Sequence, residues 1–393
     1  MSTPSSSIFA QEILYEIVGH LHGDKETVKT LSVVSSSFLP ICREVLFCSL
    51  HLNIRNCARW HSYLSACPSI GHFIQEVTIE VKGLLDAGEQ RMMFVLDRIA
   101  GPRMISFRML GHCELPDWST MPKLFQDALS RTMSTPSIRE IDIWMFDNLP
   151  ISLFSSLPPL CKLQLTSCSF PTPTMLTPTS NVELRSSGPQ VPKTRVDVLH
   201  LNSSHRPYGD NKCALDDWIG HLDFPLDLTH LSVMHVDLER RNERKIQNLL
   251  PICGQSLLHL SLSMGGGSLA ASLQHLSTLR VLQLRICIVQ GFGPHPALII
   301  PGLLRALKSL EDHDHPPKEI VISAIIESDV VFGAVSIRHW EDLDSQLLKL
   351  SPVSVRIVTT CLHSSRSEDM PDWRLLLPTL NESGRLISKC EGP

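Results

Sequence analysis

Two nine-residue segments decide the fold: "LCKLQLTSC" at residues 160–168 and "LRVLQLRIC" at residues 279–287. Each carries apolar residues at its first, fourth and sixth positions and a cysteine at its ninth. The alternation of apolar and polar residues in the middle of each segment is the period-two signature of a strand with one buried face. Each segment therefore predicts a short, half-buried strand.

The same pattern returns along the chain from residue 50 onward. Its middle apolar residues, spaced 22 to 38 residues apart, are Leu50, Val77, Ile105, Ile141, Leu163, Leu199, Leu231, Leu260, Leu282, Ile320 and Val355. Between them, apolar residues spaced three and four apart predict amphipathic helices at 88–100, 121–133, 243–254 and 303–311. Strand and helix are therefore expected to alternate as a repeat.

The residue after each of these apolar positions distinguishes a doubly wound sheet, which is covered on both faces, from a solenoid with one wet face. It is polar at His51, Thr78, Ser106, Asp142, Gln164, His200, Ser232, Ser261, Gln283 and Arg356, with Val321 as the exception. One face of the sheet is thus expected to meet water. An α/β leucine-rich-repeat solenoid, a horseshoe with parallel strands on its concave face, matches this pattern over residues 49–393.

The wet strand face is the expected place for a protein partner, because horseshoe proteins generally bind on that face. Its candidate substrate-binding residues are Arg108, Asp142, Trp144, Gln164, His200, Gln283, Arg285 and Arg356. Trp144 is the main candidate, since an exposed tryptophan is a natural hot spot. The alternative for Trp144 is burial beneath a loop as ordinary core.

Composition excludes several classes of function. The net charge is −5 with basic residues scattered along the chain, so a nucleic-acid partner is not expected. No stretch approaches the roughly 18 apolar residues of a membrane span, and there is no secretion signal, so we expect a cytoplasmic or nuclear protein without a membrane partner. Twelve cysteines without any CxxC suit buried free thiols.

No cluster of residues predicts catalysis, a metal or a cofactor. "EDHDHPP" at 311–317 places histidine and aspartate side by side, but adjacent ligands in a loop rarely meet the geometry of a metal site. "MGGGS" at 264–268 lacks the spacing of a phosphate-binding loop. The Pro-, Ser- and Thr-rich stretch 167–195 predicts a mobile surface loop. We therefore expect a non-enzymatic protein.

The opening stretch "IFAQEILYEIVGHLHGDKETVKTLSVVSSSFLP" at residues 8–40 predicts a helical unit. Apolar residues recurring every three or four positions predict a helix over 9–21. Asp24 can cap a second helix, and Pro40 suits the first turn of a third. A unit of this size cannot bury all of its apolar residues by itself. Some of these residues must therefore pack against the first repeat or against another protein.

This opening unit, residues 1–48, resembles an F-box, specifically those that precede irregular leucine-rich repeats in a large mushroom-type fungal family. The matching positions are Gln11, Glu12, Ile13, Glu16, Ile17, His20, Leu21, Val34, Ser35 and Phe38. "SIGHFIQEVTIE" at 69–80 and "LLPTLNESGRL" at 376–386 are also similar to that family. Where the family usually has Leu-Pro, this chain has Phe9 and Ala10, so a rigid helix start is missing.

The resemblance implies that the helices dock onto a Skp-type adaptor and, through it, a cullin-RING ubiquitin ligase, while the repeats hold an unknown substrate protein. The adaptor-binding residues it implies are Phe9, Glu12, Ile13, Ile17, Leu21, Leu31, Val34 and Phe38. Three alternatives stay open. An enzyme with a dispersed active site would require a deep polar pocket with convergent titratable groups, which the sequence gives no reason to expect. The helices can serve only as the N-terminal cap that a repeat array needs, or the chain can be a leucine-rich-repeat scaffold with a degenerate F-box and no ligase role.

Overall fold

The structure is a computed structural model, and its contacts divide the chain into two compact units. The first unit is Met1–Leu149 with Ser156–Leu160, and the second is Pro150–Ser155 with Cys161–Pro393. The residues that the structure describes are 11–21, 23–81, 87–111, 115–172, 193–202, 212–213, 215–218, 224–238, 243–264, 273, 276–288, 296–311, 316–326, 337–350, 353–361 and 372–391.

The first unit begins with three short helices, α1 (Gln11–His20), α2 (Lys25–Val34) and α3 (Leu39–Phe47). The predicted cap is confirmed, because the Asp24 side chain accepts a hydrogen bond from the backbone N–H of Thr27 at 3.1 Å. Pro40 lies in the first turn of α3, as predicted. The three helices share a small core of their own: Leu14, Val18, Val28, Ile41 and Cys42.

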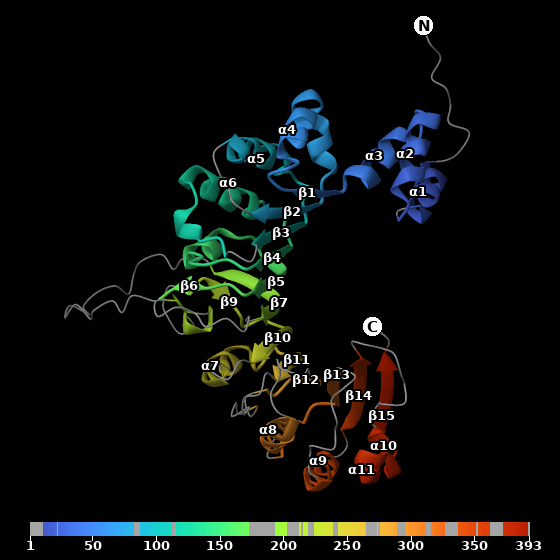
Figure 1. Cartoon of the computed structure of the whole chain (residues 1–393), viewed down its shortest axis with the longest axis vertical. Coiled ribbons are helices and arrows are strands. Elements are labelled where there is room, and N and C mark those ends of the chain that lie inside the picture. The colour runs from blue at the N-terminus through green and yellow to red at the C-terminus, as the bar shows by residue number, and fades with distance from the viewer. Residues whose placement is uncertain are drawn as a thin grey trace, which may run out of the picture. The chain divides into compact units, whose positions relative to one another are not determined.

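The rest of the first unit alternates strand and helix. Its elements are β1 (Ser49–Leu52), α4 (Cys57–Ala66), η1 (Pro68–Phe73), β2 (Glu76–Val81), α5 (Ala87–Ile99), β3 (Ser106–Gly111), η2 (Trp118–Thr120), α6 (Lys123–Met133) and β4 (Glu140–Trp144). Its strands pair in parallel and in chain order, β1 with β2, β2 with β3 and β3 with β4. Helices α4, α5 and α6 follow one another along one side of these strands (Figure 1).

The second unit continues the alternation with longer strands. Its elements are η3 (Ile151–Ser156), β5 (Leu160–Thr166), β6 (Phe170–Pro171), β7 (Thr194–Asn202), β8 (Lys212–Cys213), η4 (Leu215–Trp218), β9 (Leu226–Asp227), β10 (Val233–Leu238), α7 (Glu243–Cys253), β11 (His259–Met264), β12 (Val281–Ile288), α8 (Pro296–Lys308), β13 (Glu319–Ile326), α9 (Ile337–Lys349), β14 (Ser354–Cys361), α10 (Trp373–Leu376), α11 (Pro378–Glu382) and β15 (Leu386–Glu391). Helices α7, α8 and α9 lie along one side of its strands (Figure 1).

The α/β class is therefore confirmed. Among the described residues, thirteen strands belong to parallel sheet, four in the first unit and nine in the second, with β9 paired to β7 beside the main order. The short strands β6 and β8 form a separate antiparallel pair. The last strand, β15, extends the sheet past β14 and was not predicted.

Strand register aligns the predicted apolar positions into buried rows. Leu260 lies opposite Leu282, Leu282 opposite Ile320, and Ile320 opposite Val355, and all four are buried. Because neighbouring residues of a strand point to opposite faces, the residues between the buried ones form the strand face away from the helices. The predicted apolar face is confirmed for these strands. The opposite face is mixed, because it carries Val281, Val321, Ile325 and Val358 among its polar residues.

Two of the predicted row positions are wrong. Phe107, not Ile105, lies between Val77 and Ile141 and is fully buried, whereas Ile105 precedes β3 and is 45% exposed. Met234, not Leu231, lies opposite Leu199, because β10 begins only at Val233. In both cases an apolar residue just before the strand has the spacing expected of a buried strand residue, so the sequence pattern places the strand too early.

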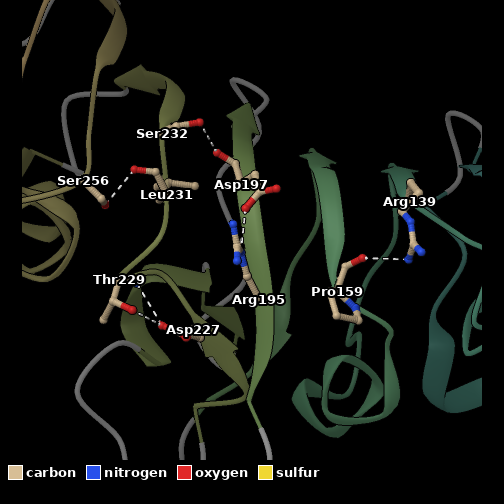
Figure 2. Close-up of polar contacts among 9 residues, drawn as sticks. All are labelled: Arg139, Pro159, Arg195, Asp197, Asp227, Thr229, Leu231, Ser232 and Ser256. Carbon is tan, nitrogen blue, oxygen red and sulfur yellow. Dashed lines mark hydrogen bonds and ion pairs between the residues drawn. The ribbon is translucent and has the colours of Figure 1, made fainter.

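The same arrangement of backbone hydrogen bonds recurs where several of the strands begin. A carbonyl at the start of one strand accepts two successive N–H groups of the next: Cys48 from Gln75 and Glu76, and Leu258 from Arg280 and Val281. Hydroxyl groups reinforce these junctions, because Ser232 Oγ donates to the Asp197 carbonyl at 3.0 Å and Ser256 Oγ to the Leu231 carbonyl at 2.9 Å (Figure 2). These links hold the beginning of each strand against the strand that precedes it in the sheet.

Other expectations are corrected in part. The predicted helices 88–100, 121–133 and 243–254 match α5, α6 and α7, but α8 begins earlier than predicted. Helices α4 and α9 fit the predicted alternation, although their bounds are not among those predicted. The stretch 167–195 is not all surface, since Ser169 and Phe170 are buried, and its residues 173–192 lie outside the described residues. Cys42, Cys57, Cys168 and Cys253 are buried free thiols, whereas Cys161 is exposed.

Candidate binding surfaces

The first candidate surface lies on α1 and α2. Ile13 and Ile17, one helical turn apart, are 45% and 37% exposed, and Val33 and Val34 at the end of α2 are 82% and 68% exposed. Leu14 and Val18 of the same first helix are buried in the three-helix core. The apolar stripe of α1 is thus divided between an internal core and an exposed side. We call Ile13, Ile17, Val33 and Val34 the helical apolar surface.

The other residues proposed for adaptor binding lie in different surroundings. Glu12 is exposed beside Ile13. Leu21, Leu31 and Phe38 are partly buried against the three-helix core, so they stabilise the helical unit as well as offering some surface. Phe9 lies outside the described residues, as does Ala10.

Polar contacts join the three helices to one another and to a neighbouring segment of the first unit. Glu44 of α3 accepts a hydrogen bond from the Tyr15 hydroxyl of α1 at 3.1 Å and pairs with the Arg103 guanidinium at 3.0 Å. None of these contacts covers Ile13 or Ile17, which remain exposed. The unit is therefore anchored without hiding the helical apolar surface.

The second candidate surface is the strand face of the first unit. The Arg108 guanidinium on β3 pairs with the Asp142 carboxylate on β4 at 3.0 Å, and the Trp144 indole N–H also donates to Asp142. On β1, His51 Nε2 lies 2.9 Å from the Glu80 carboxylate of β2. Trp144 is 37% exposed, so it is not covered as ordinary core. Of the predicted strand-face residues, the structure brings these three together: Arg108, Asp142 and Trp144.

The third candidate surface is the strand face of the second unit, which carries the other predicted residues. Gln283 donates to Ser323 Oγ at 2.8 Å, and Arg356 pairs with Glu319 at 2.8 Å. Gln164 on β5 is half-buried, and Arg285 on β12 is exposed. His200 on β7 is half-buried, and its ring packs at a tilt of 47° against that of another histidine, which is not among the predicted residues.

That histidine is His235 on β10, and a third, His259, follows on β11. The ring centroids of His200 and His235 are 4.2 Å apart, and those of His235 and His259 are 5.4 Å apart. We call these three residues the histidine stack. The sequence pattern misses His235 because it places Leu231 in the strand, although the alternation of Met234, His235 and Val236 contains the correct signal.

The histidine stack is held neutral at physiological pH. Burial lowers the pKa of His200 to about 4, and the positive charges of Lys162 and Arg285 add to the effect. Burial likewise lowers the pKa of His235 to about 4, with His200, His259, Arg285 and Lys162 contributing in the same direction. Burial also lowers the pKa of His259, against hydrogen bonding to Gln283 and the charge of Glu319, which raise it.

These lowered pKa values predict acid-sensitive stability. An unfolded histidine binds its proton near pH 6.5, whereas folded His200 and His235 bind theirs only near pH 4. The unfolded state thus binds more protons between these values, so the free energy of unfolding should fall as the pH drops from about 6.5 to 4. Urea unfolding at several pH values measures this slope.

The matched variant is the double substitution His200→Gln, His235→Gln. We expect it to flatten the pH dependence between about 6.5 and 4, while His72→Gln, which replaces an exposed histidine, leaves the slope as it is. An equally steep slope in the double variant would assign the acid sensitivity to other groups.

Comparisons with known proteins add no relative: no family model matches the chain, and no curated protein matches it. Within the described residues, no group of three or more His, Cys, Asp or Glu side chains is placed to hold a metal ion. No helix in the described part of the chain has the length and apolar character needed to cross a membrane.

Proposed function

We propose that this chain is a substrate-recognition subunit of a cullin-RING ubiquitin ligase. In this proposal, residues 1–48 are an F-box that docks onto a Skp-type adaptor, and the strand faces behind it bind the substrate protein. The single observation that carries the proposal is the helical apolar surface, because three helices with a core of their own leave Ile13 and Ile17 exposed.

The apolar residues of α1 are divided between a buried and an exposed side. This division favours docking onto a partner protein over a role as the cap of the repeat array. A cap buries its apolar side against the array that it covers. Here Leu14 and Val18 are buried within the three helices, whereas Ile13 and Ile17 face away from that core. Exposed apolar side chains gathered on a helix are typical of a surface that another protein covers.

The finer fold proposal is a leucine-rich-repeat solenoid. Its support is the repetition of parallel strands in chain order, the buried apolar rows and the recurring hydrogen bonds at the strand starts. Each strand–helix unit of such an array buries its apolar face against its neighbours. The opposite strand face then remains available for a partner.

The proposed role is to bring a substrate close to the transfer chemistry of other subunits. Holding two reactants together makes the transfer effectively unimolecular, which raises the effective concentration of the substrate. Under this proposal, Trp144 with Arg108 and Asp142 offers a mixed apolar and polar surface of the kind that protein interfaces use.

The test is binding of the full-length chain to a purified Skp-type adaptor. We expect the double substitution Ile13→Asp, Ile17→Asp to weaken binding at least a hundredfold, because it places two charges where apolar surface would be buried. Both side chains are substantially exposed, so the fold should survive the change. Isothermal titration calorimetry measures the affinity, and circular dichroism checks folding.

The matched control is Gln11→Asp, Lys25→Asp, which adds two carboxylates to exposed positions of α1 and α2 that are not apolar. We expect this control to change affinity by less than about threefold. If the unaltered chain ignores the adaptor, the ligase role is wrong and the chain is better described as a binding scaffold whose F-box no longer functions.

A further inference from the structure

We propose that the second unit carries an oxyanion-binding site at the histidine stack, formed by His200, His235, Lys162 and Arg285, and that its ligand is a dianionic group such as phosphate. This inference does not depend on the ligase proposal, because it rests on a different surface and is tested without an adaptor.

The site is built across adjacent strands. His200 lies opposite His235 in the pairing of β7 with β10, and His235 lies opposite Ser261 in the pairing of β10 with β11. Ser261 in turn lies opposite Gln283 of β12. The register therefore places imidazole, hydroxyl and amide groups side by side in one polar row.

The side-chain charges that act on His200 and His235 are positive, whereas the carboxylate of Glu319 acts on His259. Lys162 on β5 and Arg285 on β12 both act on His200 and on His235. Within the described residues neither cation has an ion pair, in contrast to Arg356, which pairs with Glu319 at 2.8 Å. The carboxylates on these and the adjoining strands are Asp197 on β7, which pairs with Arg195 at 2.9 Å, Asp227 on β9, Asp237 on β10 and Glu319 on β13. None of them is among the groups acting on His200 or His235.

Two polar atoms of β11, one in this row and one two residues before it on the same strand, are buried and have no hydrogen-bond partner within the described part of the chain. They are Ser261 Oγ and His259 Nε2. A buried polar atom without a partner destabilises the folded state, so such atoms in a native structure point to a ligand or a water that supplies the missing hydrogen bond. An oxyanion supplies acceptors for a hydroxyl and an imidazole N–H at once.

The chemistry selects a dianion. The two cations, which have no ion pair among the residues that the structure describes, match the charge of a phosphate group, which carries about −1.5 to −2 at pH 7. Hydrogen bonds from ionised donors to an oxyanion are roughly twice as strong as neutral ones. Because a bound anion favours the protonated imidazole, binding should be accompanied by proton uptake at the histidine stack.

The experiment uses the full-length chain labelled with ¹⁵N-histidine and titrated with sodium sulfate, a dianion whose charge does not change between pH 5 and 7. Sodium chloride at equal ionic strength is the reference. We expect saturable shifts of the His200 and His235 signals with sulfate and none with chloride. Affinity should rise at least threefold from pH 7 to pH 5.

Three variants, each replacing one cation with glutamine, locate the site. Arg285→Gln and Lys162→Gln should each weaken sulfate binding at least tenfold, whereas Arg356→Gln, on the same strand face but already paired with Glu319, should change it less than twofold. Thermal unfolding confirms that each variant is folded. Non-saturable shifts, or equal losses in Arg285→Gln and Arg356→Gln, would overturn the proposal.

A final comparison distinguishes binding of free phosphate from binding of a phosphorylated protein segment. A phosphoserine peptide, its unphosphorylated form and inorganic phosphate are titrated separately. Tighter binding of the phosphopeptide than of inorganic phosphate supports a site for a modified protein, and equal binding supports a site for the free anion. Binding of the unphosphorylated peptide with the same affinity as the phosphopeptide would contradict an oxyanion site.

Discussion

Replacing Phe107 with alanine should lower the free energy of unfolding by about 3–5 kcal/mol, the usual range for removing a fully buried phenylalanine from a core. Phe107 has no exposed surface and lies on β3 between Val77 of β2 and Ile141 of β4. Its removal takes away buried apolar surface and leaves a cavity among close-packed neighbours. Urea unfolding of the full-length chain measures the loss.

The matched control is Ile105→Ala. Ile105 precedes the strand and is 45% exposed, so we expect its replacement to cost no more than about 0.5 kcal/mol. The pair decides between two registers of the same segment, because the sequence pattern alone places Ile105 in the buried row. A larger loss for Ile105→Ala than for Phe107→Ala would contradict the register of β3.

Replacing Asp344 with alanine should lower the free energy of unfolding by about 3 kcal/mol. Asp344 lies on α9 and is only 3% exposed. Its two carboxylate oxygens accept the backbone N–H groups of Thr379 and Leu380 at 2.9 Å each, at the first turn of α11. Hydrogen bonds to a charged group contribute about 1.5–3 kcal/mol each, and the buried Leu380 donor would be left without a partner.

Asp342→Ala is the control for this prediction, because Asp342 is an exposed carboxylate on the same helix. We expect it to change the free energy of unfolding by no more than about 0.5 kcal/mol. Hydrogen exchange should show faster exchange of the Thr379 and Leu380 amides in Asp344→Ala alone. Equal effects of the two substitutions would mean that Asp344 does not anchor α11.

Much of the fold could be predicted from local patterns. Alternation of apolar and polar residues identified most strands, and periods of three and four identified α5, α6 and α7. Local chemistry also placed the Asp24 cap and Pro40 correctly. These features depend on interactions between residues close in sequence, so they can be predicted from short segments of the sequence.

The candidate surfaces could be predicted less completely. Arg108, Asp142 and Trp144 were selected together and do lie in contact. The sequence pattern misses His235, because one misplaced strand position moves the polar face away from it. It also misses His259, because only the polar residue that follows Leu260 is counted on that strand. The role of the candidate residues in binding stays a prediction until the affinities are measured.

The sequence by itself determined the alternation of helix and strand, the apolar face of the strands and the three opening helices. Only the tertiary structure decided which apolar residues are buried: Phe107 instead of Ile105, and Leu14 instead of Ile13. It also decided distant pairs such as His200 with His235 and Asp344 with Leu380. The physical reason is that burial and pairing depend on neighbours brought together from elsewhere in the chain, and periodicity within one segment contains no information about those neighbours.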